Sequence, residues 1–261
     1  MRIAVVQPEA SPGHRAATLQ RALHAIDLAA GHDPAPDLIL LPAFADAPAV
    51  VADMPFSAEH LHGATTAACG GRARFWGLFV VLGLAEKGID KPYLTTVLID
   101  RDGDIRRAHR QVACGAQHAA RFAPGTTLTS LDFLLGRAAL FAGDDLFDAV
   151  AWDAAVEARA QFVLGSACWM RTVDRSAGAS AIRTRIAAQA KRCGLWCAVA
   201  DITEQGGGPP PRCGGFSTVF DDRGNIVVAA DPGTGSILQA EVRLPERAPT
   251  DAEAGTMTRH E

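Results

Sequence analysis

The sequence has no apolar run that approaches the roughly 20 residues needed to span a bilayer, so we expect no membrane-spanning segment. It also has no excess of basic residues: the formal net charge is -4, which argues against nucleic acid as a partner. Residues 1–10 contain one arginine and only a short apolar run, and they lack the longer apolar stretch of a signal peptide. These absences predict a cytoplasmic protein that binds neither nucleic acid nor membranes.

Cysteine pairs with the two-residue spacing of zinc sites are missing as well. The closest pair, Cys193 and Cys197, is four residues apart and has no histidine nearby to complete a site. We therefore expect no metal and no cofactor. The cysteines are expected to be free thiols, mostly buried, in a reducing compartment. They occupy positions 69, 114, 168, 193, 197 and 213.

The composition is that of a folded globular protein, with 48% apolar residues in 261. Apolar runs rich in β-forming residues alternate with amphipathic stretches, which predicts an α/β sandwich whose sheets are covered by helices. Strands are predicted at 2–7, 37–41, 78–84, 94–100, 138–142, 162–166, 196–201, 217–221, 225–230 and 237–242. Helices are predicted at 15–30, 64–76, 147–159 and 180–192. Residues 206–215 are expected to form a loop.

Seven segments then occur in a suggestive order: MRIAVVQ, DLILLPAF, VVLGLAEK, FAPG, FAGDDLFD, FVLGSACW and GFSTVFDDRGNIV. This ordered set resembles the carbon–nitrogen hydrolases of the nitrilase superfamily over residues 1–243. The resemblance implies one domain with a four-layer αββα sandwich that pairs into a homodimer. Residues 244–261 are polar and would form a tail that is loose or bound to a partner.

The chemistry that the resemblance implies is nucleophilic. In such enzymes a cysteine attacks a nitrile or amide carbon, a glutamate moves the proton and a lysine stabilises the oxyanion. In this sequence the corresponding positions hold Ala43, Arg110 and Ala142. An alanine methyl cannot accept a proton or attack carbon, and an arginine has a different reach from a lysine. Taken singly, each alanine is equally consistent with close packing at a strand end.

One thiol offers a way to restore the chemistry. Cys168 lies at the end of a predicted strand that would neighbour the nucleophile strand, and His109 or Arg110 could lower its pKa. The alternative is a buried structural cysteine beside Trp169. Cys114 and Cys213 lie in predicted loops that could also approach the pocket.

Several polar side chains are candidates for binding a ligand at this pocket. His109 and Arg110 belong to the basic segment 106–121, which is either a solvated loop face or a rim that holds an anion. Glu86 is expected to satisfy backbone groups near the pocket. The resemblance implies that Asp144 caps the following turn. Asp144 and its neighbour Asp145 would make a poor metal site, because two adjacent aspartates point in different directions. Trp169 completes the candidate set.

Three hypotheses follow. The first is a nitrilase-fold pseudoenzyme that binds a small molecule or a protein partner. The second is a working amidase or nitrilase with a relocated thiol, Cys168. The third is a structural subunit that pairs with an active relative.

Overall fold

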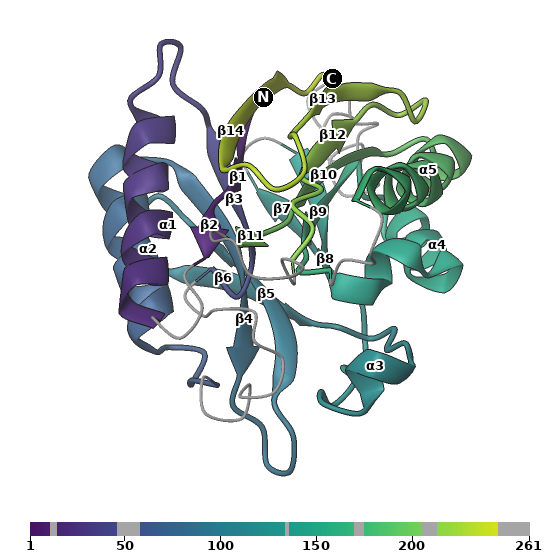
Figure 1. Ribbon diagram of the computed structural model, residues 1–261, viewed down its shortest axis with the longest axis horizontal. Coiled ribbons are helices and arrows are strands. Elements are labelled where there is room, and N and C mark those ends of the chain that lie inside the picture. The colour runs from purple at the N-terminus through teal and green to yellow at the C-terminus, as the bar shows by residue number, and fades with distance from the viewer. Residues whose placement is uncertain (11–14, 46–57, 134–135, 170–174, 205–212, 245–261) are drawn as a thin grey trace, which may run out of the picture.

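A computed structural model describes residues 1–10, 15–45, 58–133, 136–169, 175–204 and 213–244. Two six-stranded mixed sheets lie face to face (Figure 1). The first sheet has the order β14 (Ser236–Glu241), β1 (Arg2–Gln7), β3 (Leu38–Ala43), β4 (Phe79–Glu86), β5 (Tyr93–Ile99), β6 (Ile105–Arg110). The second has the order β13 (Ile226–Ala229), β12 (Thr218–Phe220), β10 (Trp196–Ala200), β9 (Phe162–Ser166), β8 (Gly136–Ala142), β7 (Thr129–Phe133). β2 (Glu9–Ala10) and β11 (Thr203–Glu204) form a short parallel pair.

Helices cover the outer face of each sheet. The helices α1 (Arg15–Ala30) and α2 (Ala64–Trp76) pack on the first sheet, and α4 (Ala149–Glu157) and α5 (Arg175–Cys193) pack on the second (Figure 1). The short helix α3 (Ala116–Ala119) follows β6, and a 3₁₀ turn, η2 (Gly143–Phe147), follows β8. The predicted four-layer αββα sandwich is confirmed. Among the described residues, no helix has both the length and the apolar character to cross a membrane.

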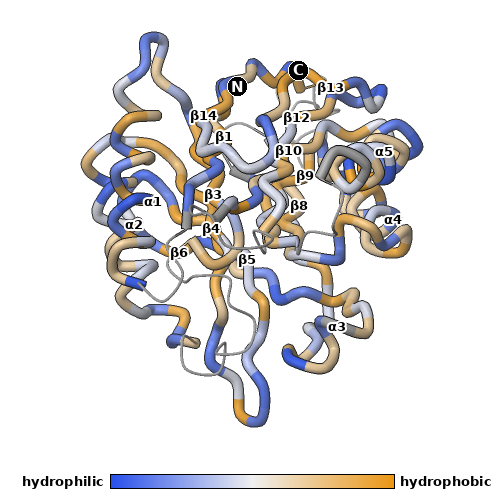
Figure 2. Tube along the Cα trace, in the orientation of Figure 1, coloured by the Kyte–Doolittle hydropathy of each residue, from blue (hydrophilic) through white to orange (hydrophobic). Residues whose placement is uncertain are grey.

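The apolar runs of the sequence are strands that are buried on both faces. Successive side chains of a strand point to opposite faces of the sheet. Leu40 of β3 and Leu164 of β9 pack between the sheets, whereas Leu41 faces α1 and α2, and Val163 faces α4 and α5. A strand in this position needs apolar residues at every step, which explains the continuous runs and the mainly apolar centre of the molecule in Figure 2.

The first strand is tied to the end of the described chain. β1 pairs antiparallel with β14, from Arg2 opposite Glu241 to Gln7 opposite Ser236. The Gln7 amide then donates to the carbonyls of Asp231 and Thr234 at 3.1 and 2.7 Å. Its oxygen accepts from the backbone N–H of Ser217, so Gln7 also contacts the second sheet.

The Asp-Gly pair at 102–103 predicts a hairpin turn after β5, and β6 is the second strand of that hairpin. The edge strand β7 was not predicted. β6 has the sequence IRRAHR, and His109 is its only fully buried residue, so the strand lacks the apolar alternation that reveals a half-buried strand. The segment 106–121 is therefore not a loop throughout. The predicted helix at 147–159 begins only at Ala149, because the Asp148 side chain accepts from the Ala151 N–H and caps it. Predictions for 206–212 and 245–261 lie outside the described residues.

Candidate functional site

A buried group of side chains, the strand-end cluster, lies where β3, β4, β8 and β9 end. Parallel strands β3 and β4 of the first sheet, and β8 and β9 of the second, finish at the same edge of the sandwich. Ligands of α/β proteins commonly bind outside the carboxyl ends of strands. The cluster consists of Ala43, Phe44, Ala85, Leu94, Phe122, Ala142, Cys168, Ile202 and Cys213.

The two sheets are hydrogen-bonded to each other beside this cluster. The Ala43 N–H donates to the carbonyl of Ala167 at 3.1 Å, and the Ser166 hydroxyl donates to the carbonyl of Leu41 at 2.9 Å. Gly83 permits this approach, because a Cβ there would lie 2.7 Å from the Cα of Ala43. The end of the sandwich that should hold the chemistry is thus a closely packed junction.

Ala43 and Ala142, which were predicted to replace the base and the nucleophile, meet in this cluster and are both 0% exposed. The tight turn predicted after β8 is present, with Gly143 at φ 51°. A Cβ at Gly143 would lie 2.4 Å from Oε1 of Gln111 and 2.8 Å from Cδ2 of Leu94. The side chains of Gln111 and Leu94 therefore occupy the space next to the turn that follows Ala142.

Arg110 does not join the two alanines, which corrects its predicted place at the pocket. It lies opposite Thr95 on β5 and on the same face of β6 as Ala108, which packs toward α1 and α2. Its guanidinium donates to Glu86 and lies 4.1 Å from the centre of the Tyr93 ring. In a strand of period two, the residue that faces the sandwich interior must be a neighbour of Arg110.

Glu86 has a different role from the predicted one of satisfying backbone groups. It accepts from Nε and Nη2 of Arg110 at 2.9 and 2.6 Å and from the Thr95 hydroxyl at 2.8 Å. Burial acts to raise the pKa of this carboxyl, but the hydrogen bonds from Arg110 and Thr95 outweigh it and hold the pKa below its usual value. Glu86 is thus an ionised partner of Arg110 on the helix-covered face.

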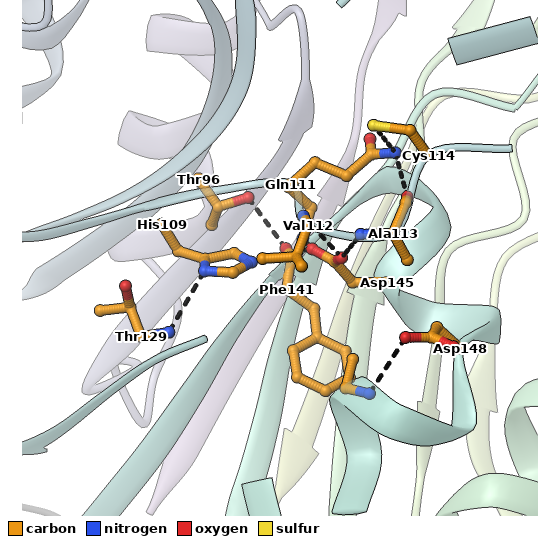
Figure 3. A network of polar contacts seen from close by, with 12 residues as sticks. Thr96, His109, Gln111, Val112, Ala113, Cys114, Thr129, Phe141, Asp145 and Asp148 are labelled. Atoms are coloured by element: carbon orange, nitrogen blue, oxygen red, sulfur yellow. Dashed lines mark hydrogen bonds and ion pairs between the residues drawn. The ribbon is translucent and has the colours of Figure 1, made fainter. Parts of the chain in front are cut away.

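His109 faces the interior, and both of its ring nitrogens are engaged (Figure 3). Its Nδ1 accepts from the backbone N–H of Thr129 at 3.2 Å, so Nε2 carries the proton and donates to Asp145 at 2.8 Å. The histidine and the aspartate are both fully buried. His109 therefore links β6 to β7 and η2, and neither nitrogen is left to hold an anion or to activate Cys168.

Asp145, rather than its neighbour Asp144, caps the turn. Besides His109, it accepts from the backbone N–H groups of Val112 and Ala113 at 3.0 and 2.8 Å (Figure 3). It also accepts from the backbone N–H of Ala142 at 3.1 Å. Asp144 instead accepts from the N–H of Gly115 and lies 3.2 Å from Nδ1 of His118. The two carboxylates point in different directions, and the described residues include no group of three potential metal ligands.

Gln111 is the polar side chain that sequence analysis missed. It is fully buried, its Oε1 lies 3.1 Å from Nδ1 of His118, and its Nε2 donates to the carbonyl of Ala113. Its proximity to Gly143 makes it, rather than Arg110, the β6-end residue that reaches the turn after Ala142. A neutral amide there supplies no positive charge for an oxyanion. Only the alternation of inward-facing and outward-facing residues along β6 could have indicated the position of Gln111. Using that alternation requires the correct register of the strand.

Cys168 lies in the strand-end cluster as predicted, but its partner is another thiol. Its Sγ is 3.2 Å from the Sγ of Cys213, and the two residues are 9% and 0% exposed. The groups expected to activate it, His109 and Arg110, are committed to Asp145 and to Glu86. The structure does not bring the predicted thiol and base together.

Trp169 faces the second helix layer. Its side chain packs with the core beneath α4 and α5, 5.0 Å from the ring of Phe147, and its Nε1 has no hydrogen-bond partner among the described residues. Its backbone N–H donates to Asp201 at 3.2 Å. Burial raises the pKa of Asp201 to about 7, although backbone N–H groups, including those of Phe216 and Ile202, favour the carboxylate.

A surface hollow of about 640 Å³ lies on the outer side of Phe122. Phe122 belongs to the strand-end cluster and packs against Phe44, with ring centres 6.0 Å apart. The hollow is mainly apolar, and Lys91, Tyr93 and Cys114 also line it. Burial, with the charges of neighbouring aspartates, raises the pKa of Cys114, so this thiol is not activated.

Comparison with known families agrees with this architecture. The family model described as carbon-nitrogen hydrolase matches residues 2–251. The chain therefore belongs to the carbon–nitrogen hydrolase family, and the resemblance seen in the sequence is confirmed. No curated protein matches the sequence.

Among solved structures, the chain is similar to an amidase from Nesterenkonia sp. With one structure of this amidase it shares 24% sequence identity and a TM-score of 0.79, covering 99% of this chain and 96% of the other. With a cysteine-to-alanine variant of the amidase from Nesterenkonia sp. AN1, in complex with butyramide, the identity is 24% and the TM-score 0.78, covering 92% and 89%. At this identity the likeness establishes the fold.

Proposed function

We propose that this protein is a non-catalytic member of the carbon–nitrogen hydrolase family that acts by binding rather than by hydrolysis. The observation that carries the proposal is the meeting of Ala43 and Ala142, fully buried, in one cluster at the carboxyl ends of the strands. Neither methyl can transfer a proton or attack a carbonyl or nitrile carbon.

The groups around the two alanines support the same proposal. Gln111 is neutral, His109 spends both nitrogens on Thr129 and Asp145, and Arg110 is on the opposite face of its strand. A general base must come within hydrogen-bond reach of the proton it removes. Asp145 accepts four hydrogen bonds from His109 and backbone N–H groups, so it is held in place as a structural acceptor.

Binding of an amide has a precedent on this fold. The butyramide complex of the Nesterenkonia variant shows that an amidase in which a cysteine has become alanine still holds an amide. We extend this to the present chain and propose a small uncharged ligand as its binding partner. A dimer with itself or with a related subunit remains a prediction.

The test is ammonia release by the purified full-length chain from a panel of amides and nitriles, with an active amidase as the positive control. We expect no release above that of a heat-denatured sample. Binding is tested separately by calorimetric titration with butyramide. Turnover that follows the chain through successive purification steps would refute the proposal.

The relocated-thiol hypothesis is decided in the same assay. If turnover is found and Cys168→Ala abolishes it while Cys193→Ala does not, Cys168 is the nucleophile. The contact between Cys168 and Cys213 argues against this hypothesis. The group beside the Cys168 sulfur is the thiol of Cys213, and a catalytic base would have to occupy that position.

A further inference from the structure

The two buried thiols of the strand-end cluster come from distant parts of the chain. Cys168 follows β9, and Cys213 lies beyond the β10–β11 region, 45 residues later. Their segments are held side by side, because the backbone N–H of Gly214 donates to the carbonyl of Trp169 at 3.0 Å. Residues directly adjacent to both cysteines are therefore fixed by a backbone hydrogen bond, and the two sulfurs are kept together by the fold.

The two sulfurs are in direct contact and are not bonded. Their separation is 3.2 Å, whereas a disulfide has an S–S length of about 2.04 Å, so bond formation requires the sulfurs to approach by about 1.2 Å. Small rotations about the two Cα–Cβ bonds provide movements of this size. The hydrogen bond between Gly214 and Trp169 holds the two backbones together while the sulfurs approach.

We propose that Cys168 and Cys213 form a reversible disulfide, which makes the strand-end cluster a thiol–disulfide redox site whose co-reactant is a low-molecular-weight disulfide. The inference goes beyond the proposed function and holds whether or not the chain turns over a substrate. Thiol–disulfide exchange by these two cysteines does not require the catalytic glutamate of the family.

The exposure of the two residues sets the order of steps. Cys168 is 9% exposed and Cys213 is 0% exposed, so the small disulfide reaches Cys168 first. The Cys168 thiolate attacks one sulfur of that disulfide, forming a mixed disulfide and releasing one thiolate. The Cys213 thiolate then attacks the Cys168 sulfur, forming the internal S–S bond and expelling the second thiolate. Two protein thiols lose two electrons and two protons, and the small disulfide gains them as two thiols.

The other cysteines serve as internal controls. Cys69 packs beneath α1 and α2, Cys197 lies in the core beneath α4 and α5, and Cys114 contacts Gln111. Burial raises the pKa of Cys114, Cys193 and Cys197, which lowers the fraction of thiolate at each of them. Oxidation is therefore expected to be selective for the Cys168–Cys213 pair.

The sequence favours a direct test by mass spectrometry. Trypsin releases Cys168 in the peptide 160–171 and Cys213 in the peptide 213–223, each with one cysteine. The full-length protein is equilibrated with reduced glutathione or with glutathione disulfide, unfolded in the presence of iodoacetamide and digested. We expect the two peptides to be joined in the oxidised sample and to be separately alkylated after treatment with dithiothreitol. The oxidised protein should also melt several degrees higher, because the bond closes a loop of about 45 residues.

Variants separate this proposal from simple thiol reactivity. Cys213→Ser should stop the reaction at the mixed disulfide, so the peptide 160–171 carries glutathione. Cys168→Ser should leave Cys213 unmodified, and Cys193→Ser should leave the joined peptides unchanged. Because the joined peptides are sought in the natural chain, the test does not depend on the folding of any variant.

Two results would overturn the proposal. One is full alkylation of both peptides after equilibration with glutathione disulfide and with the smaller 2-hydroxyethyl disulfide. The other is accumulation of glutathione on Cys168 in the natural chain without joined peptides, which would show that Cys213 cannot reach the mixed disulfide.

Discussion

Arg110 holds Glu86 in a two-point ion pair on the helix-covered face of the first sheet, turned away from Ala142. The side chain of Glu86 is 8% exposed, whereas that of Arg110 is 47% exposed. Arg110 therefore neutralises the buried carboxylate of Glu86. Without the arginine, the side-chain hydrogen bond of this carboxylate would come from the hydroxyl of Thr95. Arg110 was expected at the position of the family's catalytic lysine, but its contacts make it a structural partner of Glu86.

Replacing this arginine should cost stability and leave the strand-end cluster unchanged. We expect Arg110→Met to lower the free energy of unfolding by about 1–2 kcal/mol at pH 7. Because the folded pKa of Glu86 is below its usual value, the stabilisation exists above about pH 4.5 and is lost at lower pH, where the loss in the variant should shrink. Urea unfolding at pH 7 and at pH 3.5 measures both effects. Arg107→Met, an exposed residue on the same strand, is the control, and equal losses in the two variants would contradict the assignment.

The Asp145 carboxylate should be far more sensitive than its neighbour Asp148. Asp145→Asn places an amide donor against backbone N–H groups and the His109 ring, so we expect a loss of about 2–4 kcal/mol. Asp148→Asn should have little effect, because asparagine is also a good helix cap. Chemical unfolding of both variants tests the contrast. A loss for Asp145→Asn no larger than for Asp148→Asn would show that the Asp145 bonds contribute little.

The junction between the sheets should be intolerant of one methyl group. In Gly83→Ala the new Cβ would lie 2.7 Å from the Cα of Ala43 and 2.8 Å from the Cβ of Ser166, so we expect a loss of about 2–3 kcal/mol. Gly71→Ala in α2 meets nothing within 4 Å and should stabilise the protein by about 0.5–1 kcal/mol. Melting temperatures should move in opposite directions, and a neutral Gly83→Ala would mean that the sheets can separate at this edge.

Asp201 should contribute a dependence on pH of the opposite sign to that of Glu86. Its pKa is raised to about 7 by burial, so the folded protein binds this proton more tightly than the unfolded chain does. Its contribution to stability is complete below about pH 4 and falls as the pH rises to about 7. The free energy of unfolding at pH 5 minus that at pH 8 should therefore be smaller in Asp201→Asn than in the natural chain. Asp222→Asn, in an exposed turn, should leave the difference unchanged.

The sequence predicts those parts of the fold that are buried on both sides. The run that forms β3 is apolar at every position, and β9 is apolar from Phe162 to Leu164. The tight turn at Gly143 was predicted from the residues around it. The apolar pattern does not reveal β6, because the outer face of this strand is solvated and its buried residue is a histidine. An error of one residue in its register exchanges the two faces, which is why Arg110 was expected where Gln111 lies.

The contacts of the candidate site depend on tertiary structure. Nothing in the residues near Cys168 indicates Cys213, because no local spacing relates two positions that are 45 residues apart. The same holds for Asp145, whose partners come from the separate loop after β6. Ala43 and Ala142 were identified only through the resemblance to a family, since an alanine alone carries no chemical signal.

The pairing of β1 with β14 has a consequence for synthesis of the protein on the ribosome. The backbone of Met1 is hydrogen-bonded to Val242, 241 residues later, so β1 can pair only with β3 until β14 has been synthesised. During that interval its open edge can pair with other nascent chains. We expect the first sheet to close only after β14 has been synthesised, and chaperones that shield strand edges should raise the yield of soluble protein.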